Sequence, residues 1–226
     1  MSSKKSGSTS LTLTLGGILF LAMLVVTSIG IYGAIFLYTR FPLRPYTISL
    51  FGVSQIPSIW IPGPNTGYSI FYQYISDLGV GPSSFLFNAS MIIAGVLTIP
   101  AFPTLLRPLG STGAAKIGVI LGIIAGVGLI GVGLFPETTG GYHTLFATIY
   151  FLSTFIAIGV LSYANNSSKF FSKYVQWLGY IAFIVGPICT GLVLFLGPPP
   201  EWILIFLVLI WDLPLGIDML AKRKSL

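Results

Sequence analysis

Long runs of apolar residues, separated by short polar or Gly- and Pro-containing connections, recur six times along this 226-residue chain. A helix needs about 20 residues to cross the ~30 Å hydrocarbon core of a bilayer, and each run is long enough. The pattern therefore predicts an all-α bundle of six membrane-spanning helices. The expected spans are Leu11–Tyr38, Ser84–Leu106, Ala114–Phe135, His143–Tyr163, Val175–Leu196 and Glu201–Leu220.

The first apolar run follows Lys4 and Lys5, an arrangement that is also typical of a secretory signal. The run is much longer than the apolar region of a signal peptide, and no clear small-residue cleavage site follows it. We therefore interpret it as a retained span that is preceded by a short tail, residues 1–10.

The composition supports a membrane protein. Hydrophobic residues make up 54% of the chain and charged residues 7%, and the mean hydropathy is +0.94. A soluble domain carries roughly a quarter charged residues because its surface faces water. We therefore expect a multi-pass protein of the cell membrane whose surface contacts lipid. Its net charge of +6 comes from few residues, and nucleic acid is not an expected partner.

The distribution of basic residues predicts the orientation. With six spans, both termini lie on one side, and that side carries nine of the eleven Lys and Arg residues, whereas Arg40 and Arg44 lie opposite. Basic residues are enriched in cytoplasmic connections. The termini, including the basic tail 221–226, are therefore predicted to be cytoplasmic. The nine residues are Lys4, Lys5, Arg107, Lys116, Lys169, Lys173, Lys222, Arg223 and Lys224.

The outer side has the one long connection, residues 39–83, which is rich in Pro, Gly and aromatic residues. Its low charge is untypical of a flexible linker, so we expect it to fold over the outer end of the bundle. Residues 66–79 within it are predicted to form a short interfacial helix. Aromatic side chains are expected at headgroup level, namely Trp60, Tyr68, Phe71 and Tyr72.

Asp77, in YISDLGVGP, is one of only five acidic residues and precedes the second span. Two interpretations stay open. Its carboxylate can bond local backbone N–H groups in an Asx turn, with Pro82 preset for the first helical turn. Alternatively, Asp77 lines an outward-facing polar site together with other side chains at the outer ends of the spans.

Glu137 and His143 lie in LFPETTGGYH, between the third and fourth spans. Pro136 is expected to end one helix, and Gly140 and Gly141 permit a tight reversal. A carboxylate and an imidazole held together at one membrane face can form an acid–base pair, a cation site or a clamp on a lipid headgroup. The alternative is a solvated Glu137 and an interfacial, hydrogen-bonded His143. Glu201 also falls at the outer end of a span.

Asp212, in LIWDLPLG, is predicted to lie about 16 Å along the sixth span from Glu201, near the middle of the bilayer. A charged side chain there costs about 2.5–3.5 kcal/mol, so it normally faces the bundle interior. We expect Asp212 to be protonated or hydrogen-bonded to Asn88 or Tyr150 and to mark an internal polar pocket. A purely structural bond between helices is the alternative.

Three glycines of the third span, Gly118, Gly122 and Gly126, repeat every fourth residue. Such spacing lets neighbouring backbones approach closely in lipid, so the third span is predicted to be a packed central helix. Asn165 and Asn166 each open an N-x-S sequon, but the predicted topology places them on the cytoplasmic side, where glycosylation is not expected.

The single cysteine and the single histidine, Cys189 and His143, exclude an intramolecular disulfide, a His-rich zinc site and a bis-histidine haem. The sequence has no phosphate-binding loop and no serine-nucleophile elbow, so no cofactor is expected and no reaction can be derived. The expected partners are membrane lipids, and other membrane subunits or a second copy of the chain are left open.

Three features in this order resemble an uncharacterised family of archaeal and bacterial six-span membrane proteins, domain of unknown function 998. They are SDLG (Ser76–Gly79) followed by Phe87 and Asn88, FPE (Phe135–Glu137), and His143 with Ala147. The resemblance runs from about Tyr72 to the end of the sixth span, and it implies that Asp77, Glu137 and His143 share an outer site. The Frag/DRAM/Sfk membrane family, which includes GPI-anchor lipid-remodelling factors, is more distantly similar and carries a comparable I-S-D motif.

Alkaline-ceramidase-type lipid hydrolases are similar in helix count, but they hold zinc with three histidines and this chain has one. Three functional hypotheses follow. The first is a protein that binds or processes a lipid or small polar ligand at the outer leaflet, with Asp77, Glu137, His143, Asn88 and Tyr142 at the site and Trp60 or Tyr68 in contact with the ligand. The second is a proton-linked transporter or channel that uses Asp212. The third is a structural subunit of a larger membrane complex.

Overall fold

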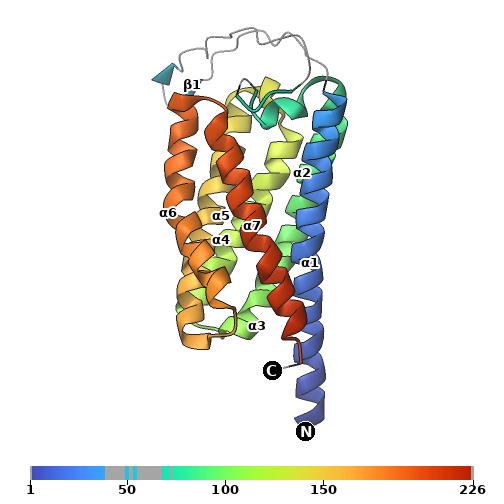
Figure 1. Ribbon diagram of the computed structural model, residues 1–226, viewed down its shortest axis with the longest axis vertical. Helices are drawn as coiled ribbons and strands as arrows, with labels where there is room; N and C mark the ends of the chain where they lie inside the picture. Colours follow the sequence, from blue (N-terminus) through green and yellow to red (C-terminus); the bar gives the residue numbers. More distant parts are fainter. Residues whose placement is uncertain (1, 39–48, 51–52, 55–67, 72, 225–226) are drawn as a thin grey trace.

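The computed structural model describes residues 2–38, 49–50, 53–54, 68–71 and 73–224. Within them, six helices are long and apolar enough to cross a membrane, which confirms the predicted fold. Figure 1 shows them running side by side along the long axis of the molecule. They are α1 (Ser2–Leu37), α2 (Ser84–Ala101), α4 (Gly113–Leu134), α5 (Gly141–Ser168), α6 (Lys173–Leu196) and α7 (Pro199–Ala221).

Short elements connect these helices. The second span is continued beyond α2 by the 3-10 helix η3 (Phe102–Leu105) and by α3 (Leu106–Leu109). At the opposite end lie three single 3-10 turns, η1 (Ser76–Gly79), η2 (Gly81–Ser83) and η4 (Glu137–Thr139). Two strands of two residues each, β1 (Ser49–Leu50) and β2 (Val53–Ser54), pair antiparallel in the long connection.

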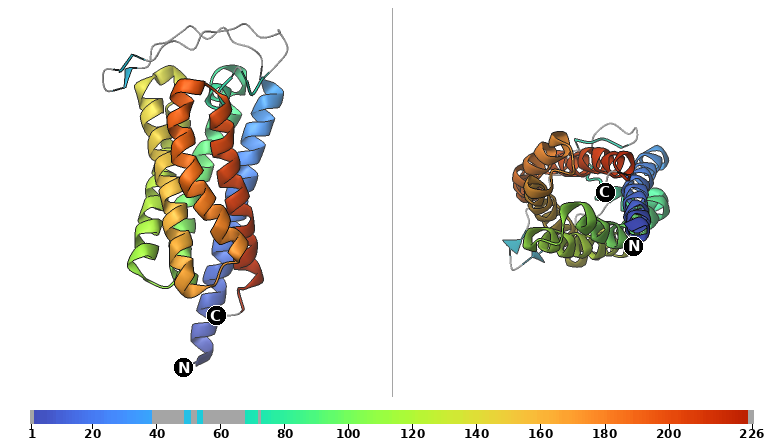
Figure 2. Two further views of the ribbon diagram at one scale, coloured as in Figure 1. Left: turned by 60° about the vertical axis from the view of Figure 1, so that its left-hand side comes forward. Right: turned by 90° about the horizontal axis from the view of Figure 1, so that it is seen from below.

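The six long helices form a closed ring. Each packs against two neighbours, in the order α1, α2, α4, α5, α6 and α7, and α7 returns to α1. The view along the bundle axis shows this ring directly (Figure 2). Its interior is filled by large side chains that are almost fully inaccessible, such as Phe20, Phe155 and Trp211.

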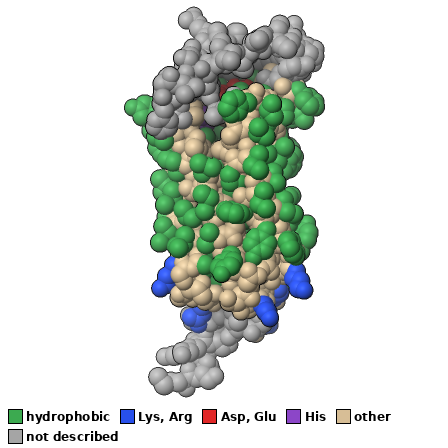
Figure 3. Space-filling model, turned by 90° about the vertical axis from the view of Figure 1, so that its left-hand side faces the viewer, with side chains coloured by type: hydrophobic (Ala, Val, Ile, Leu, Met, Phe, Trp, Pro, Cys, Tyr) green, Lys and Arg blue, Asp and Glu red, His purple; other side chains and the backbone are tan. Residues whose placement is uncertain are grey.

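The outer wall of the ring is apolar. Large hydrophobic side chains such as Phe36, Phe85 and Phe195 are each more than 80% exposed, and the space-filling view shows hydrophobic side chains over the long sides of the molecule (Figure 3). Such a surface is stable against lipid hydrocarbon and unfavourable in water. The chain is therefore an integral, multi-pass membrane protein.

Glycines allow α4 to pack closely against both of its neighbours. A Cβ atom on Gly126 would lie 3.0 Å from the carbonyl oxygen of Gly95 on α2, and one on Gly128 would lie 2.7 Å from the backbone nitrogen of Tyr150 on α5. The close packing predicted for the third span is present. Its central position is not, because α4 is one member of the ring wall between α2 and α5.

Both chain ends lie at the same end of the bundle (Figure 1), as six spans require. Lys and Arg side chains gather at this end on the face shown in Figure 3, and the assignment of this end to the cytoplasm stays a prediction. Residues 2–10 continue helix α1, and their assignment to a cytoplasmic tail stays a prediction. One local expectation is corrected. Within residues 66–79, the described part is helical only over Ser76–Gly79, as a 3-10 turn.

Candidate functional site

Asp77 stabilises the turn in which it lies. Its Oδ2 accepts a hydrogen bond of 2.8 Å from the backbone N–H of Tyr74, three residues earlier, as an acidic residue in the first turn of a helix does in a capping box. Asp77 thus bonds a local backbone N–H group, which was one of the two open interpretations. The donor is an earlier residue, whereas in an Asx turn the side chain accepts from a later backbone N–H. Pro82 lies in η2, directly ahead of α2.

Three of the five acidic residues converge on this turn. Asp77 and Glu137 share a hydrogen bond between their side chains, and Ser76 Oγ donates to Glu137 Oε1 at 3.2 Å. The backbone N–H of Ile75 donates to Glu201 Oε2 at 2.6 Å. These contacts join η1, η4 and the start of α7. We call Ser76, Asp77, Glu137, His143 and Glu201 the outer cluster.

The outer cluster is withdrawn from solvent, since Asp77, Glu137 and His143 are 6%, 7% and 6% exposed. Burial raises the pKa of Asp77 well above its ordinary value, and the charge of Glu137 and the hydrogen bond to it act in the same direction. Two adjacent buried carboxyl groups cannot both ionise readily. The Asp77–Glu137 pair therefore holds a proton at a pH where an exposed pair would have lost both.

His143 is anchored by its own loop. Its Nδ1 lies 2.8 Å from the carbonyl oxygen of Phe135, and a carbonyl only accepts, so Nδ1 carries the proton and donates. Gly140, at the N-terminus of α5, has a φ of 63°, which makes possible the tight reversal that returns His143 beneath the end of α4. The ring lies near enough to Asp77 for a charge on it to act on that carboxyl.

An aromatic group adjoins the outer cluster. The rings of Tyr38, Tyr68 and Trp202 lie edge to face, with centroids 5.4 Å and 6.0 Å apart. Trp202 Nε1 donates to Tyr68 Oη at 3.2 Å, and Tyr68 Oη donates to the carbonyl of Gln73 at 3.1 Å. Burial, followed by the charge of Glu201, raises the pKa of Tyr68. Burial and the nearby carboxylates also raise the pKa of Tyr74 to about 12.

Two residues predicted for the site lie at its margin. Tyr142 is 63% exposed and stacks on Phe135 with centroids 5.6 Å apart. Asn88 Nδ2 donates to the carbonyl of Gly79 at 3.0 Å, so Asn88 supports the turn rather than bonding Asp212, which corrects one of its two expected roles. Two of the aromatic residues expected at headgroup level, Trp60 and Tyr72, lie outside the described residues.

Asp212 lines an internal cavity of about 30 Å³ and is 4% exposed. Tyr150, one of its two expected partners, lines the same cavity. The cavity lies about halfway along α7, away from the outer cluster, and most of the residues that line it are apolar. That Asp212 marks a functional polar pocket stays a prediction.

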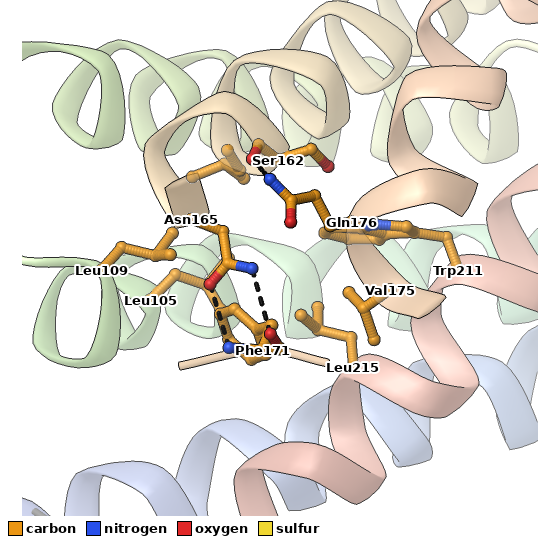
Figure 4. Close-up of a pocket in the computed structure, with 10 residues that line it drawn as sticks. Leu105, Leu109, Ser162, Asn165, Phe171, Val175, Gln176, Trp211 and Leu215 are labelled. Atoms are coloured by element: carbon orange, nitrogen blue, oxygen red, sulfur yellow. Dashed lines mark hydrogen bonds between the residues drawn. The ribbon is translucent and has the colours of Figure 1, made fainter. Parts of the chain in front are cut away.

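A second polar group lies near the end of the bundle where both chain termini lie, beside a cavity of about 10 Å³ (Figure 4). Asn165 holds the chain after α5, because its Oδ1 accepts from the N–H of Phe171 at 2.9 Å and its Nδ2 donates to the carbonyl of the same residue at 3.1 Å. The side-chain amide of Asn165 is thus buried and hydrogen-bonded, which excludes glycosylation of Asn165 in this conformation.

The side chains of the outer cluster support two kinds of chemistry. They can hold and release protons and can accept hydrogen bonds through their carboxyl oxygens. Within the part of the chain that the structure describes, no group of three or more His, Cys, Asp or Glu side chains is arranged to hold a metal ion.

Ser76, Glu201 and Trp202 extend the site beyond the residues that were predicted to form it. Tyr68, which was predicted to contact the ligand, packs against Trp202. Glu201 was recognisable from its place at the outer end of a span, and Ser76 from its place in the SDLG motif. No signal in the sequence pairs Trp202 with Tyr68, because they are 134 residues apart.

Comparison with known protein families places the chain in one of them. The model of a family described as Protein of unknown function (DUF998) matches residues 53–217. The chain belongs to this family. The match covers well over half of the chain and includes every residue of the outer cluster and Asp212, whereas α1 precedes it. No curated protein and no solved structure matches the chain.

Proposed function

We propose that this DUF998 protein binds a lipid or a small polar ligand at the outer leaflet through the outer cluster, and that the bound group is an amine or ammonium. The observation that carries the proposal is the convergence of Asp77, Glu137 and Glu201 on one short turn. The chain has five acidic residues in all, so three at one place are a marked concentration.

The fold alone does not require so many carboxyl groups. Burying a carboxyl away from water is unfavourable unless it is paired. One oxygen of Asp77 and one of Glu201 serve backbone N–H groups, while a carboxylate offers about four acceptor positions. The outer cluster thus has acceptor capacity beyond what the turn uses, and a positively charged donor would complement it.

The neighbouring aromatic rings favour the same class of ligand. Trp202 immediately follows Glu201 and packs against Tyr68. An ammonium group over the face of a Trp or Tyr ring gains about 0.5–2 kcal/mol, depending on desolvation. Carboxylates on one side and aromatic rings on the other suit an amine-bearing headgroup better than a phosphate or a neutral acyl chain.

Native mass spectrometry of the gently purified protein tests the proposal. The wild-type protein should carry a specific lipid or small molecule that is lost from Asp77→Asn/His143→Ala. Removing a hydrogen bond to a charged group costs about 1.5–3 kcal/mol, so affinity should fall roughly tenfold or more.

The matched control is Asp218→Asn, which removes a carboxylate at the opposite end of α7, where Asp218 accepts from the N–H of Ser172. This variant should retain the bound species. If wild type and the double variant carry the same bulk lipids in the same ratio, the outer cluster is not a binding site.

A further inference from the structure

The cavity beside Asp212 lies deep within the membrane-spanning region. Asp212 is 13 residues after Pro199 and 9 before Ala221, the ends of α7, which corresponds to about 20 Å and about 14 Å along the helix. A water molecule needs roughly 10–15 Å³ of such space. The cavity of about 30 Å³ therefore accommodates about two waters or one small ion with a water.

Four helices contribute polar groups to this cavity. Thr27 comes from α1, Thr98 from α2, Tyr150 and Thr154 from α5, and Asp212 from α7. The remaining described lining residues are apolar apart from the indole N–H of Trp211. The cavity is thus a small polar site enclosed by hydrophobic side chains.

The hydroxyl of Thr154 supports the presence of an occupant in the cavity. Thr154 is 5% exposed, and its Oγ1 has no hydrogen-bond partner within the described part of the chain. Thr98 differs, because its hydroxyl donates to the carbonyl of Ala94 at 2.8 Å. A buried hydroxyl is normally paired, so the missing partner of Thr154 is most simply a molecule or ion in the cavity that it lines.

The carboxyl group of Asp212 decides what that occupant is. The described residues that line the cavity include no Lys, Arg or His, and Tyr150 is the only other titratable group that they provide from any of the surrounding helices. An ionised carboxylate at this depth costs about 2.5–3.5 kcal/mol or more. A neutral occupant would leave that charge unbalanced, and a divalent one would overcompensate it.

We propose that this cavity binds a small monovalent cation, a proton or a sodium ion, on the carboxyl of Asp212, with the hydroxyls of Thr154 and Tyr150 as its further partners. The inference does not depend on the outer cluster. In this proposal Asp212 binds a cation that exchanges with the solution, whereas a purely structural role would give Asp212 a permanent hydrogen bond between helices.

Polar groups continue from this cavity toward the inner end. Trp211 lines both this cavity and the smaller one near Asn165 (Figure 4). The smaller cavity is also lined by Ser162 and Gln176, and Gln176 Nε2 donates to the exposed Asn166. The indole of Trp211 therefore lies between the two cavities, on the side of Asp212 that faces Ser162, Asn165 and Gln176.

Labelling with a hydrophobic carbodiimide tests the proposal, since the reagent adds to a protonated carboxyl. The full-length protein is treated across a pH series in choline chloride and again in sodium chloride, and the modified peptide is measured by mass spectrometry. We expect a label on Asp212 that declines as pH rises and is absent from Asp212→Asn. Suppression by sodium but not choline at fixed pH identifies sodium as a ligand, whereas equal labelling identifies the proton alone.

Labelling of Asp212 that is independent of both pH and sodium would overturn the proposal, because the carboxyl would then be permanently protonated. Infrared spectroscopy covers the case in which the reagent does not reach the cavity. Because the Asp77–Glu137 pair also contributes to the protonated-carboxyl band, the spectrum of Asp212→Asn is subtracted from that of wild type. A component that titrates in this difference supports the proposal, and a difference without such a component contradicts it.

Thr154→Val separates the site from a purely structural role of Asp212. It removes the unpaired hydroxyl with little change of shape, so the bound proton or sodium ion loses one partner and the pH midpoint of labelling should move downward by about one unit. The control is Thr190→Val, whose hydroxyl donates to the carbonyl of Gly186 on α6 at 2.9 Å. This control should keep the wild-type midpoint, and an unshifted midpoint in Thr154→Val would remove Thr154 from the site.

Discussion

Replacing Asp77 by Asn should flatten the dependence of stability on pH. In the folded protein, burial and Glu137 hold the pKa of Asp77 well above its ordinary value, and an unfolded chain returns it to about 3.9. The folded state then binds more protons, so the free energy of unfolding is highest below the unfolded pKa and decreases as pH rises toward the folded pKa. One linked proton corresponds to a slope of about 1.4 kcal/mol per pH unit.

A slope of that size is measurable by heating. For a chain of this length, 1 kcal/mol shifts Tm by about 2–4 °C, so wild type should lose about 3–6 °C per pH unit above pH 4. Asn cannot ionise. Its side-chain oxygen can still accept the hydrogen bond that the backbone N–H of Tyr74 donates to Asp77 at 2.8 Å in wild type. The decrease in pH slope expected for Asp77→Asn reports the titration of Asp77 and Glu137 as a pair, and not that of Asp77 alone.

The assay is circular dichroism of the protein in mild detergent, heated at several pH values. Asp218→Asn is the control, because it removes a carboxylate far from the outer cluster and should retain the wild-type difference between pH values. If Asp77→Asn shows the same slope as wild type, the protonated pair is not the source of the pH dependence, and the reasoning from burial is wrong.

Three further predictions concern packing and topology. Gly128→Ala should destabilise the protein by about 1–3 kcal/mol in thermal unfolding, because its Cβ would lie 2.7 Å from the backbone nitrogen of Tyr150, whereas Gly191→Ala, with no atom near, should not. Asn165→Ala should cost about 1–3 kcal/mol in the same assay by leaving the backbone groups of Phe171 unpaired. In right-side-out vesicles, an impermeant maleimide should label Thr138→Cys at once and Ser111→Cys only after permeabilisation.

The sequence was sufficient to predict the six spans because membrane insertion depends on a one-dimensional property, the length of an apolar run. The same reasoning placed Asp77, Glu137 and Glu201 at one end, since alternate connections of an even-numbered bundle lie on the same side. It could not predict that Glu201 accepts from the N–H of Ile75, because that contact depends on how far α7 is rotated within the ring.

The arrangement of the helices was harder to infer than their number. The glycines of α4 indicate close packing, but they do not say which neighbours approach, and only the structure shows glycines facing both α2 and α5. Asn88 was a reasonable partner for Asp212 by residue type, and it is near the wrong end of the bundle. Helix order and rotation decide such pairs, and a single sequence contains no signal for either.

The two polar regions of α7 can be perturbed separately. Glu201 and Asp212 are eleven residues apart, which places them on one face of the helix at about 16 Å. With an effective dielectric constant of about 20, two unit charges at that distance interact by about 1 kcal/mol, less than one pKa unit. Asp212→Asn should therefore move the pH range over which the outer cluster titrates by less than one unit and leave the slope assigned to that cluster at about 1.4 kcal/mol per pH unit. A larger change would mean that the two regions are linked through movement of α7 and not through charge alone.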